Sequence, residues 1–219
     1  MLKLYGVARS RATRPIWLME EIGMRYEHVP VIQAYRLKDP MAEGAQINTL
    51  TPSFLALSPA GAIPVLDDDG LVLSESVAIS LYLAKKYGGD LGPKDAAEEA
   101  LMTQWGLYGI TMIEGPALTI LYVRGDGRAK TRDGEVEIAV ASEKLKRPLK
   151  VLDDHLAKTG FLVGGRFTVA DINMAEMVRY ASAEAGLMAQ FPAVVKWLKA
   201  LHERSAWKAM WAMRLAEPE

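Results

Sequence analysis

The chain has 219 residues, half of them hydrophobic, and its 26 basic and 27 acidic residues leave a formal net charge of −1. This balance gives no reason to expect nucleic acid or an anionic membrane surface as a partner. The absence of cysteine excludes a disulfide scaffold, a thiolate metal site and cysteine catalysis. The three histidines lack the spacing of metal ligands, so no metal is expected.

The N-terminal part predicts alternating strands and helices. A short strand over 2–6 leads through a loop into a helix over 10–22, and a second strand follows over 26–32. Strand, helix and strand in this order predict a parallel βαβ unit. The polar segment over 33–52 is long for a connection without regular structure, and such segments are often functional.

The stretch from Ser58 to Tyr87, SPAGAIPVLDDDGLVLSESVAISLYLAKKY, predicts a strand, a hairpin, a second strand and a helix. Asp69-Gly70 is a strong hairpin signal between two short apolar runs. Pro64 cannot donate to a β-ladder, so it favours a sheet edge or a special turn. The backbone of Ile63 would then be free to pair with an extended ligand.

Polar residues gather where this helix begins, at Ser74, Glu75 and Ser76. Free N–H groups and the positive end of the helix dipole attract a carboxylate there. Ser76 can add a hydroxyl donor, and Glu75 can accept from an ammonium group. Beside the backbone of Ile63, this arrangement suits a small peptide with a free α-amino-acid end. Proline is also common at the start of strands and serine at the start of helices, so the interpretation that these residues only begin the two elements stays open.

From position 88 onwards the sequence predicts a linker and then only helices. The run Gly88 to Pro93 has the composition of a linker. A long helix is predicted over 95–123, with a kink at Gly115-Pro116. A second is predicted over 135–158, interrupted or bent at Pro148. Thr168-Val169-Ala170-Asp171 has the spacing of a capping box that starts another helix, and closing helices follow over 194–203 and 207–215.

The stretch from Ser58 to Tyr87 resembles the second half of the glutathione-binding domain of the cytosolic glutathione transferase family. LYGVARSRATRPIWLMEE resembles that family's first strand, loop and helix, and the Thr-x-x-Asp box is a hallmark of its helical domain. The resemblance implies an α/β thioredoxin-like N-terminal domain followed by an all-α C-terminal helical domain. We expect the glutathione-binding domain over 1–87, the linker over 88–93, and the helical domain with the electrophile site over 94–219.

The resemblance also implies the glutathione contacts. Pro64 is expected in the cis form, and Ile63 is expected to pair through its backbone with the cysteinyl part of glutathione. Glu75 and Ser76 are expected to hold the γ-glutamyl end. Glutathione is then a cosubstrate, and neither a metal nor a prosthetic group is implied.

The resemblance places the electrophile between the domains, against the helix that follows the linker. Trp105, Tyr108 and Met112 share one face of that helix and are the candidates to line the site. Methionine suits an adaptable apolar pocket. The alternative is that these residues simply form the core between packed helices.

Ser10 is the candidate to activate the glutathione thiol. The family's reaction is attack of the sulfur on an electrophile, so the protein must favour the thiolate. A hydroxyl that donates to the anion is worth about 1.5–3 kcal/mol, which lowers a thiol pKa near ~8.5 by about one to two units. Ser10 falls where the serine-type and cysteine-type classes carry their activating residue, and Arg11 beside it can stabilise the thiolate by charge. A simple helix cap at Ser10, or activation by Tyr5 or Thr13, are the alternatives.

Two features depart from the family pattern. Ala62 stands where members often carry glutamine or lysine, and the run Gln46 to Leu50 lacks the basic residue often found before the short helix. Glutathione binding is therefore expected to be weaker, or to use other contacts from 33–52. Serine in place of cysteine argues against the thiol-disulfide activities of the cysteine-type classes.

These observations favour a cytoplasmic, homodimeric glutathione S-transferase that conjugates glutathione to hydrophobic electrophiles in detoxification. A glutathione-dependent etherase or dehalogenase with one substrate is an alternative. So is a non-catalytic glutathione- or ligand-binding or regulatory protein, because fold does not determine function. No nucleic acid and no membrane are expected as partners.

Overall fold

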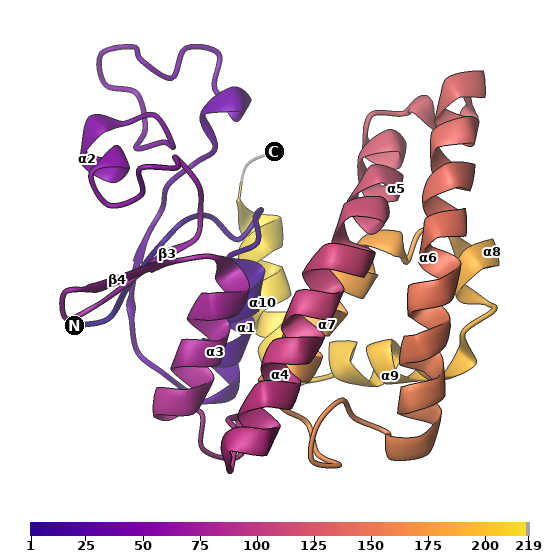
Figure 1. Cartoon of the computed structure of the whole chain (residues 1–219). Coiled ribbons are helices and arrows are strands. Elements are labelled where there is room, and N and C mark those ends of the chain that lie inside the picture. The colour runs from indigo at the N-terminus through magenta and orange to yellow at the C-terminus, as the bar shows by residue number, and fades with distance from the viewer. Residues whose placement is uncertain (218–219) are drawn as a thin grey trace. The chain divides into compact units, whose positions relative to one another are not determined.

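The computed structural model describes residues 1–217 and divides the chain into two compact units (Figure 1). The first contains Met1–Gly89 together with the C-terminal segment from Ser205, and the second contains Asp90–Arg204. The sequence assigned all of 94–219 to the helical domain. The structure differs at the C-terminus, because α10 (Ser205–Ala216) packs against α1 (Thr13–Glu21) within the first unit.

A four-stranded mixed sheet, in the order β2-β1-β3-β4, forms the centre of the first unit. Strand β1 (Lys3–Tyr5) runs parallel to β2 (Glu27–Val29) and antiparallel to β3 (Val65–Asp68). Strand β3 pairs antiparallel with β4 (Leu71–Ser74). The arrangement confirms the predicted thioredoxin-like fold and its parallel strand-helix-strand beginning.

The hairpin between β3 and β4 turns where the sequence predicts. Asp69 and Gly70 have φ angles of 51° and 94°, in the left-handed region that a tight two-residue turn requires. The Asp67 carboxylate accepts a hydrogen bond of 2.9 Å from the backbone N–H of Gly70. Glycine at the second turn position tolerates its positive φ without a side-chain clash.

Side chains alternate between the two faces of the sheet. Tyr5 and Val65 are partners in register, and they pack with Val31 and with Phe54 of α2 (Pro52–Leu55). Tyr5 is therefore part of a packed apolar cluster on the α2 face.

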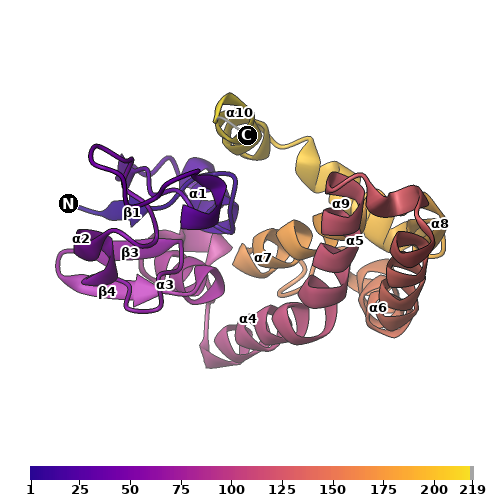
Figure 2. The ribbon, with the colours of Figure 1, turned by 90° about the horizontal axis from the view of Figure 1, so that it is seen from above.

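The other face of the sheet carries the next pair in register, Leu4 and Leu66, both fully buried. Helices α1 and α3 (Ser76–Tyr87) lie together on this side of the sheet (Figure 2). Helix α1 is buried from Thr13 to Met19, because α3 and α10 both pack on it.

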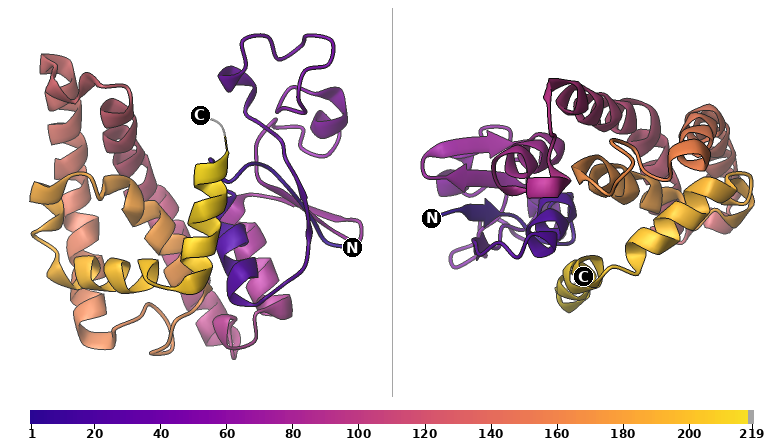
Figure 3. Two further views of the ribbon diagram at one scale, coloured as in Figure 1. Left: turned by 180° about the vertical axis from the view of Figure 1, so that it is seen from behind. Right: turned by 90° about the horizontal axis from the view of Figure 1, so that it is seen from below.

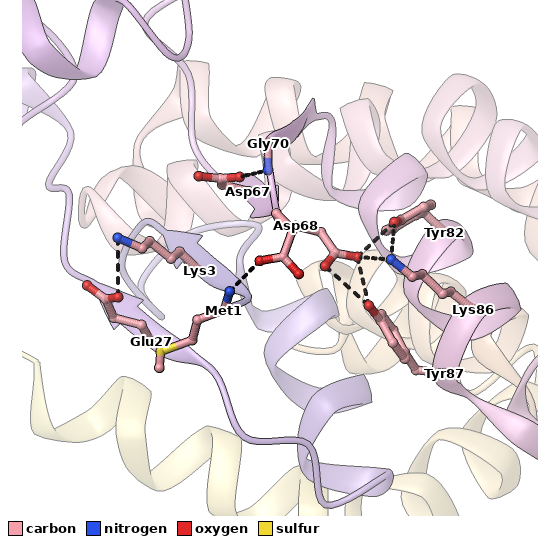
Figure 4. A network of polar contacts seen from close by, with 10 residues as sticks. Met1, Lys3, Glu27, Asp67, Asp68, Gly70, Tyr82, Lys86 and Tyr87 are labelled. Carbon is pink, nitrogen blue, oxygen red and sulfur yellow. Dashed lines mark hydrogen bonds and ion pairs between the residues drawn. The ribbon is translucent and has the colours of Figure 1, made fainter.

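Asp68 joins the end of β3 to the C-terminal turn of α3 (Figure 4). Its carboxylate accepts from Lys86 Nζ at 2.6 Å, Tyr82 Oη at 2.7 Å and Tyr87 Oη at 2.9 Å. Burial of Asp68 opposes ionisation, but the three donors outweigh it and lower the pKa of the carboxyl. The network holds α3, whose first residues belong to the candidate site, on the sheet.

We expect Asp68→Asn to remove a stabilisation that depends on pH. A carboxyl with a lowered pKa stabilises the fold above its unfolded-state pKa of about 3.9, and this contribution is lost as pH falls below that value. Urea unfolding measured from pH 7 to pH 3 should show that wild type has the larger free energy of unfolding, and that its difference from the variant becomes smaller as the pH falls. A difference that stays constant with pH would mean that the carboxylate charge contributes nothing.

The second unit is helical throughout its regular structure. Its helices are α4 (Ala96–Tyr108), α5 (Gly115–Gly125), α6 (Arg132–Thr159), α7 (Val169–Val178), α8 (Ala185–Met188) and α9 (Pro192–His202). Helix α5 packs along α6, and α6 packs against α9. All ten residues of α7 are buried, and its orange ribbon lies among the other helices of this unit (Figure 3). A helix buried on all sides is the core of such a bundle.

A π-helical segment, Gly109–Glu114, joins α4 to α5 where the sequence predicts a kink. Pro116 follows two residues after this segment and cannot donate the backbone hydrogen bond of an α-helix, so a widened turn relieves its contact with the preceding turn. Helix α6, in contrast, runs through Pro148 without an interruption.

The continuous helical stretch Ala96–Gly125 is long and apolar enough to cross a membrane by length and composition alone. A single helix that meets this test is weak evidence for a membrane span, and α5 of this stretch packs along α6. We therefore interpret it as part of the bundle, in which α4 contacts α7.

The predicted capping box at the start of α7 is present. Asp171 is fully buried and accepts hydrogen bonds of 3.0 Å from Thr168 N, 3.1 Å from Leu162 N and 3.0 Å from Trp197 Nε1. Its burial raises the pKa of the carboxyl to about 6, against the lowering effect of these donors. Asp171 therefore connects the start of α7 to the loop at Leu162 and to α9 through Trp197.

Candidate functional site

Ser10 lies in the turn between β1 and α1, three residues before the helix begins at Thr13. Its Oγ donates to the carbonyl oxygen of Val7 at 2.6 Å and accepts from the backbone N–H of Ala12 at 3.0 Å. The N-cap residue of α1 is Ala12, which has no side-chain cap bond. Ser10 satisfies a backbone N–H two residues on, as a cap residue does, and its hydroxyl must rotate away from Val7 before it can donate to a ligand.

The other candidates for activation occupy different surroundings. Tyr5 packs in the apolar cluster on the α2 face of the sheet. Thr13 is fully buried, and its hydroxyl donates to the carbonyl oxygen of Ser10 at 3.3 Å. The side chain of Arg11 is exposed beside the turn. Among these residues, Ser10 and Arg11 combine partial exposure with a place in the loop.

The Ile63-Pro64 peptide bond is cis, directly before β3. Gly6 brings this bond against the Ser10 loop: a side-chain carbon built on Gly6 would lie 3.5 Å from Cβ of both Ala12 and Ile63 and 3.6 Å from Cα of Pro64. The φ of Gly6 is +144°, a value that favours glycine. The structure therefore places the loop that carries Ser10 next to the Ile63-Pro64 bond, two parts of the predicted site.

Glu75 and Ser76 stand at the start of α3. Glu75 is exposed, and its backbone has a φ of 69° and a ψ of 109°. Few residues with a side chain adopt this conformation, and backbone strain of this kind is concentrated at functional sites. Ser76 is buried, and its Oγ accepts a hydrogen bond of 2.7 Å from the guanidinium of Arg14. Because Ser76 accepts from Arg14, its own proton remains available for an incoming carboxylate.

Arg14 lies behind the candidate site, and the sequence analysis did not name it. It is only 1% exposed and reaches from α1 to the start of α3, 62 positions along the chain. Its position within the apolar run of α1 could have indicated a buried arginine with a polar partner, since an arginine is almost never fully buried without partners. A buried positive charge behind Ser76 strengthens the attraction of this helix start for a carboxylate.

In the second unit, Trp105 is buried and its ring lies 4.9 Å from that of His155 on α6. Tyr108 packs edge-on against Trp105, with its hydroxyl 3.4 Å from the carbonyl oxygen of Pro148. Burial raises the pKa of Tyr108. Met112 is 44% exposed. The two aromatic residues therefore contribute to the contact with α6, whereas Met112 presents an open apolar surface.

Within residues 1–217, no group of three or more histidine, aspartate or glutamate side chains is arranged to hold a metal ion.

Comparison with known proteins identifies both units. The model of the glutathione S-transferase N-terminal domain matches residues 4–91, and that of the C-terminal domain matches residues 102–205. Glutathione S-transferase 3 of Zea mays is 34% identical over 230 residues, which cover 99% of this chain and 96% of the relative. The chain belongs to the cytosolic glutathione transferase family. It is an enzyme of the glutathione S-transferase kind, as the sequence predicts.

Solved structures agree with this assignment. The transferase superposes on glutathione transferase F7 of Populus trichocarpa with a TM-score of 0.80 at 26% identity, covering 98% of this chain and 99% of that one. It superposes on transferase URE2P6 of Phanerochaete chrysosporium with a TM-score of 0.77 at 26% identity, covering 98% and 96%. The likeness extends over both units.

The segment over 33–52 of this transferase is ordered by Asn48, which is 1% exposed. Its side-chain amide donates to the carbonyl oxygens of Pro40 and Gln46, both at 2.9 Å, and its Oδ1 accepts from Leu50 N at 2.9 Å. The run that lacks the family's basic residue is thus a folded loop around one asparagine. Ala62, the second departure, is held by Ser58, whose Oγ donates to the Ala62 carbonyl oxygen at 3.0 Å.

Proposed function

We propose that the first unit of this transferase binds glutathione as cosubstrate and activates its thiol for attack on hydrophobic electrophiles. The observation that carries the proposal is the contact at Gly6, which holds the Ser10 loop against the cis Ile63-Pro64 bond. URE2P6 of Phanerochaete chrysosporium was solved in complex with oxidized glutathione, which supports a glutathione site on this fold.

In this proposal the tripeptide contacts three parts of the unit. The backbone of Ile63, before Pro64, pairs with the cysteinyl part. Ser76 donates to the γ-glutamyl carboxylate, and the exposed carboxylate of Glu75 accepts from the ammonium group. Ser10 then donates to the sulfur, with Arg11 adding positive charge. These roles follow the polarity of each group.

We propose the helix from α4 to α5 as the source of the electrophile contacts. Met112 is the most exposed member of the predicted set, with 44% of its surface accessible. Trp105 and Tyr108 would support it from the contact with α6. The expected cytoplasmic location, homodimer and role in detoxification rest on the family alone and are part of the same proposal.

The proposed function is tested by turnover of glutathione with a chlorinated dinitroaromatic and with a panel of ethers and haloaromatics. Activity against the generic substrate supports a broad transferase. Activity confined to one ether or one halide would identify the narrow etherase or dehalogenase instead. Glutathione binding without any turnover would favour the non-catalytic alternative, and failure to bind glutathione in calorimetry contradicts the proposal.

We expect Arg14→Met to weaken glutathione binding while it spares the chemical step. The variant removes the buried cation behind Ser76 but leaves Ser10 in place, so KM for glutathione should rise about ten-fold, the equivalent of about 1.4 kcal/mol. Arg14→Lys keeps the charge and should restore part of the affinity. Steady-state kinetics and circular dichroism together separate this result from misfolding; a fall in kcat at unchanged KM would contradict the assignment.

A further inference from the structure

The loop that carries Ser10 is held by the residue that follows α10. Glu217 comes directly after this helix, and its carboxylate accepts hydrogen bonds from two successive backbone N–H groups, at 2.6 Å from Ala8 and 2.8 Å from Arg9. Each carboxylate oxygen has its own donor, and hydrogen bonds to an ionised acceptor are the stronger kind. Arg9 adds a third contact, because its Nε donates to the carbonyl oxygen of Glu217 at 3.0 Å.

Arg214, on the last turn of α10, holds the same loop from a second atom. Its guanidinium donates to the carbonyl oxygen of Ala8 at 2.8 Å. It also lies 5.4 Å from the centroid of the Trp211 ring, a cation–π contact that orients the side chain. Helix α10 itself packs along α1, into which the loop leads (Figure 3). Glu217 and Arg214 therefore form a clamp on a packed helix within the first unit.

The backbone of Ala8 depends on this clamp. Ala8 is fully buried, so its N–H and C=O groups need partners within the protein. The N–H donates to Glu217 and the C=O accepts from Arg214, which are 209 and 206 positions away along the chain. Because both partners lie outside the loop, the clamp determines the conformation of this backbone.

The clamped residues lie between the two ends of the hydrogen bond that holds the Ser10 hydroxyl. Ser10 donates to the carbonyl oxygen of Val7 at 2.6 Å, and Ala8 and Arg9 are the residues between them. When the hydroxyl leaves Val7 to donate to a sulfur, the loop loses this internal bond. The clamp then keeps the backbone in place, so that only the hydroxyl rotates. A misplacement of about 1 Å at a reacting group is enough to slow a reaction strongly.

We propose that Glu217 and Arg214 are positioning residues of the conjugation reaction, which fix the Ala8-Arg9 backbone so that the Ser10 hydroxyl reaches the glutathione sulfur. The inference rests on the proposed function, because the clamp acts through Ser10. Neither residue belongs to the proposed contacts with the cysteinyl and γ-glutamyl parts of glutathione. The clamp therefore governs the state of the thiol and not the affinity for the tripeptide.

The negative charge of Glu217 would by itself have the opposite effect. A carboxylate near a thiolate disfavours the anion and raises the thiol pKa. Removal of a charge effect alone would therefore lower the pKa of bound glutathione. Removal of the clamp raises that pKa, because Ser10 donates less well to the thiolate. The sign of the change in pKa separates the two roles.

The pKa of enzyme-bound glutathione, measured with the full chain from the ultraviolet absorbance of the thiolate, tests the proposal. Glu217→Ala removes both acceptors, so this pKa should rise by about half a unit and kcat at pH 7 should fall about three-fold, with KM for glutathione nearly unchanged. Glu217→Gln keeps one acceptor and should give an intermediate rise. Arg214→Met should also raise the pKa. Leu215→Ala, at an exposed position of the same helix, is the matched control.

A double variant shows whether Glu217 acts through Ser10. In the Ser10→Ala background, Glu217→Ala should change the pKa of the bound thiol no further, because the effects of residues that act through one another do not add. Circular dichroism and urea unfolding of each variant show whether the fold is retained.

Two outcomes would overturn the proposal. One is a thiol pKa that is unchanged or lowered in Glu217→Ala, and the other is a further rise of the same size in the Ser10→Ala background. An effect of Ser10→Ala without an effect of Glu217→Ala contradicts only this inference. A wild-type thiol pKa in Ser10→Ala contradicts the proposed activation by Ser10 itself, so the two failures are distinguishable.

Discussion

Ser10→Ala should raise the pKa of enzyme-bound glutathione by about one unit and lower kcat/KM at pH 7 by about ten-fold. A hydroxyl donated to a thiolate is worth about 1.5–3 kcal/mol. The Ser10 hydroxyl, however, already donates to Val7 at 2.6 Å, and that bond must be given up. A neutral hydrogen bond is worth about 0.5–1.5 kcal/mol, so the net effect is close to one pKa unit, or about 1.4 kcal/mol.

The ultraviolet absorbance of the thiolate, followed against pH in wild type and variant, measures this shift directly. Ser10→Thr keeps the hydroxyl and should keep most of the effect. Thr13→Val is the matched control, because it removes a neighbouring hydroxyl that is fully buried and therefore cannot reach the ligand. If the shift persists in Ser10→Ala, the activator is another group, with Arg11 and Tyr5 next to be tested.

Asp171→Ala should cost about 3–5 kcal/mol of the free energy of unfolding, the largest stability effect that we expect in this chain. The substitution removes the capping box and leaves the N–H groups of Leu162 and Thr168 and the indole of Trp197 without their acceptor. A lost cap costs about 1 kcal/mol, and each buried donor left unsatisfied costs about 1–3 kcal/mol. Urea unfolding at pH 8, where the carboxyl is ionised, measures the loss.

Asn173→Ala is the control for this prediction. Asn173 lies two positions further along the same helix and is also fully buried, but its amide forms no hydrogen bond with the described residues. Its truncation should therefore change stability by no more than about 1 kcal/mol. Equal losses in the two variants would mean that packing, and not the hydrogen bonds of Asp171, determines the effect.

The pKa of Asp171 adds a dependence on pH with a defined sign. Its folded-state pKa of about 6 lies above the usual value of 3.8, so the folded state holds the proton more tightly than the unfolded state does. This contribution to stability is present below about pH 4 and declines as pH rises to about 6. Asp171→Asn does not titrate and should lack that decline.

Local chemistry in the sequence was sufficient for much of the fold. Asp69-Gly70 predicts the hairpin because only a few residue types accept the positive φ angles of the turn. Thr168 and Asp171 predict the start of α7 because the capping bonds join residues three positions apart. Ser10, Ile63, Pro64, Glu75 and Ser76 were named from short motifs and from the family that those motifs resemble.

The remaining features depend on which distant segments meet, and no local pattern encodes that. The placement of α10 with the first unit follows from its packing on α1, which no local pattern in its sequence indicates. The Arg14 guanidinium meets Ser76 across 62 positions, and the Glu217 carboxylate meets Ala8 across 209. By itself the sequence determined the elements, the family and the proposed glutathione contacts; only the tertiary structure decided which charges stand behind those contacts, because burial and pairing arise when the elements pack.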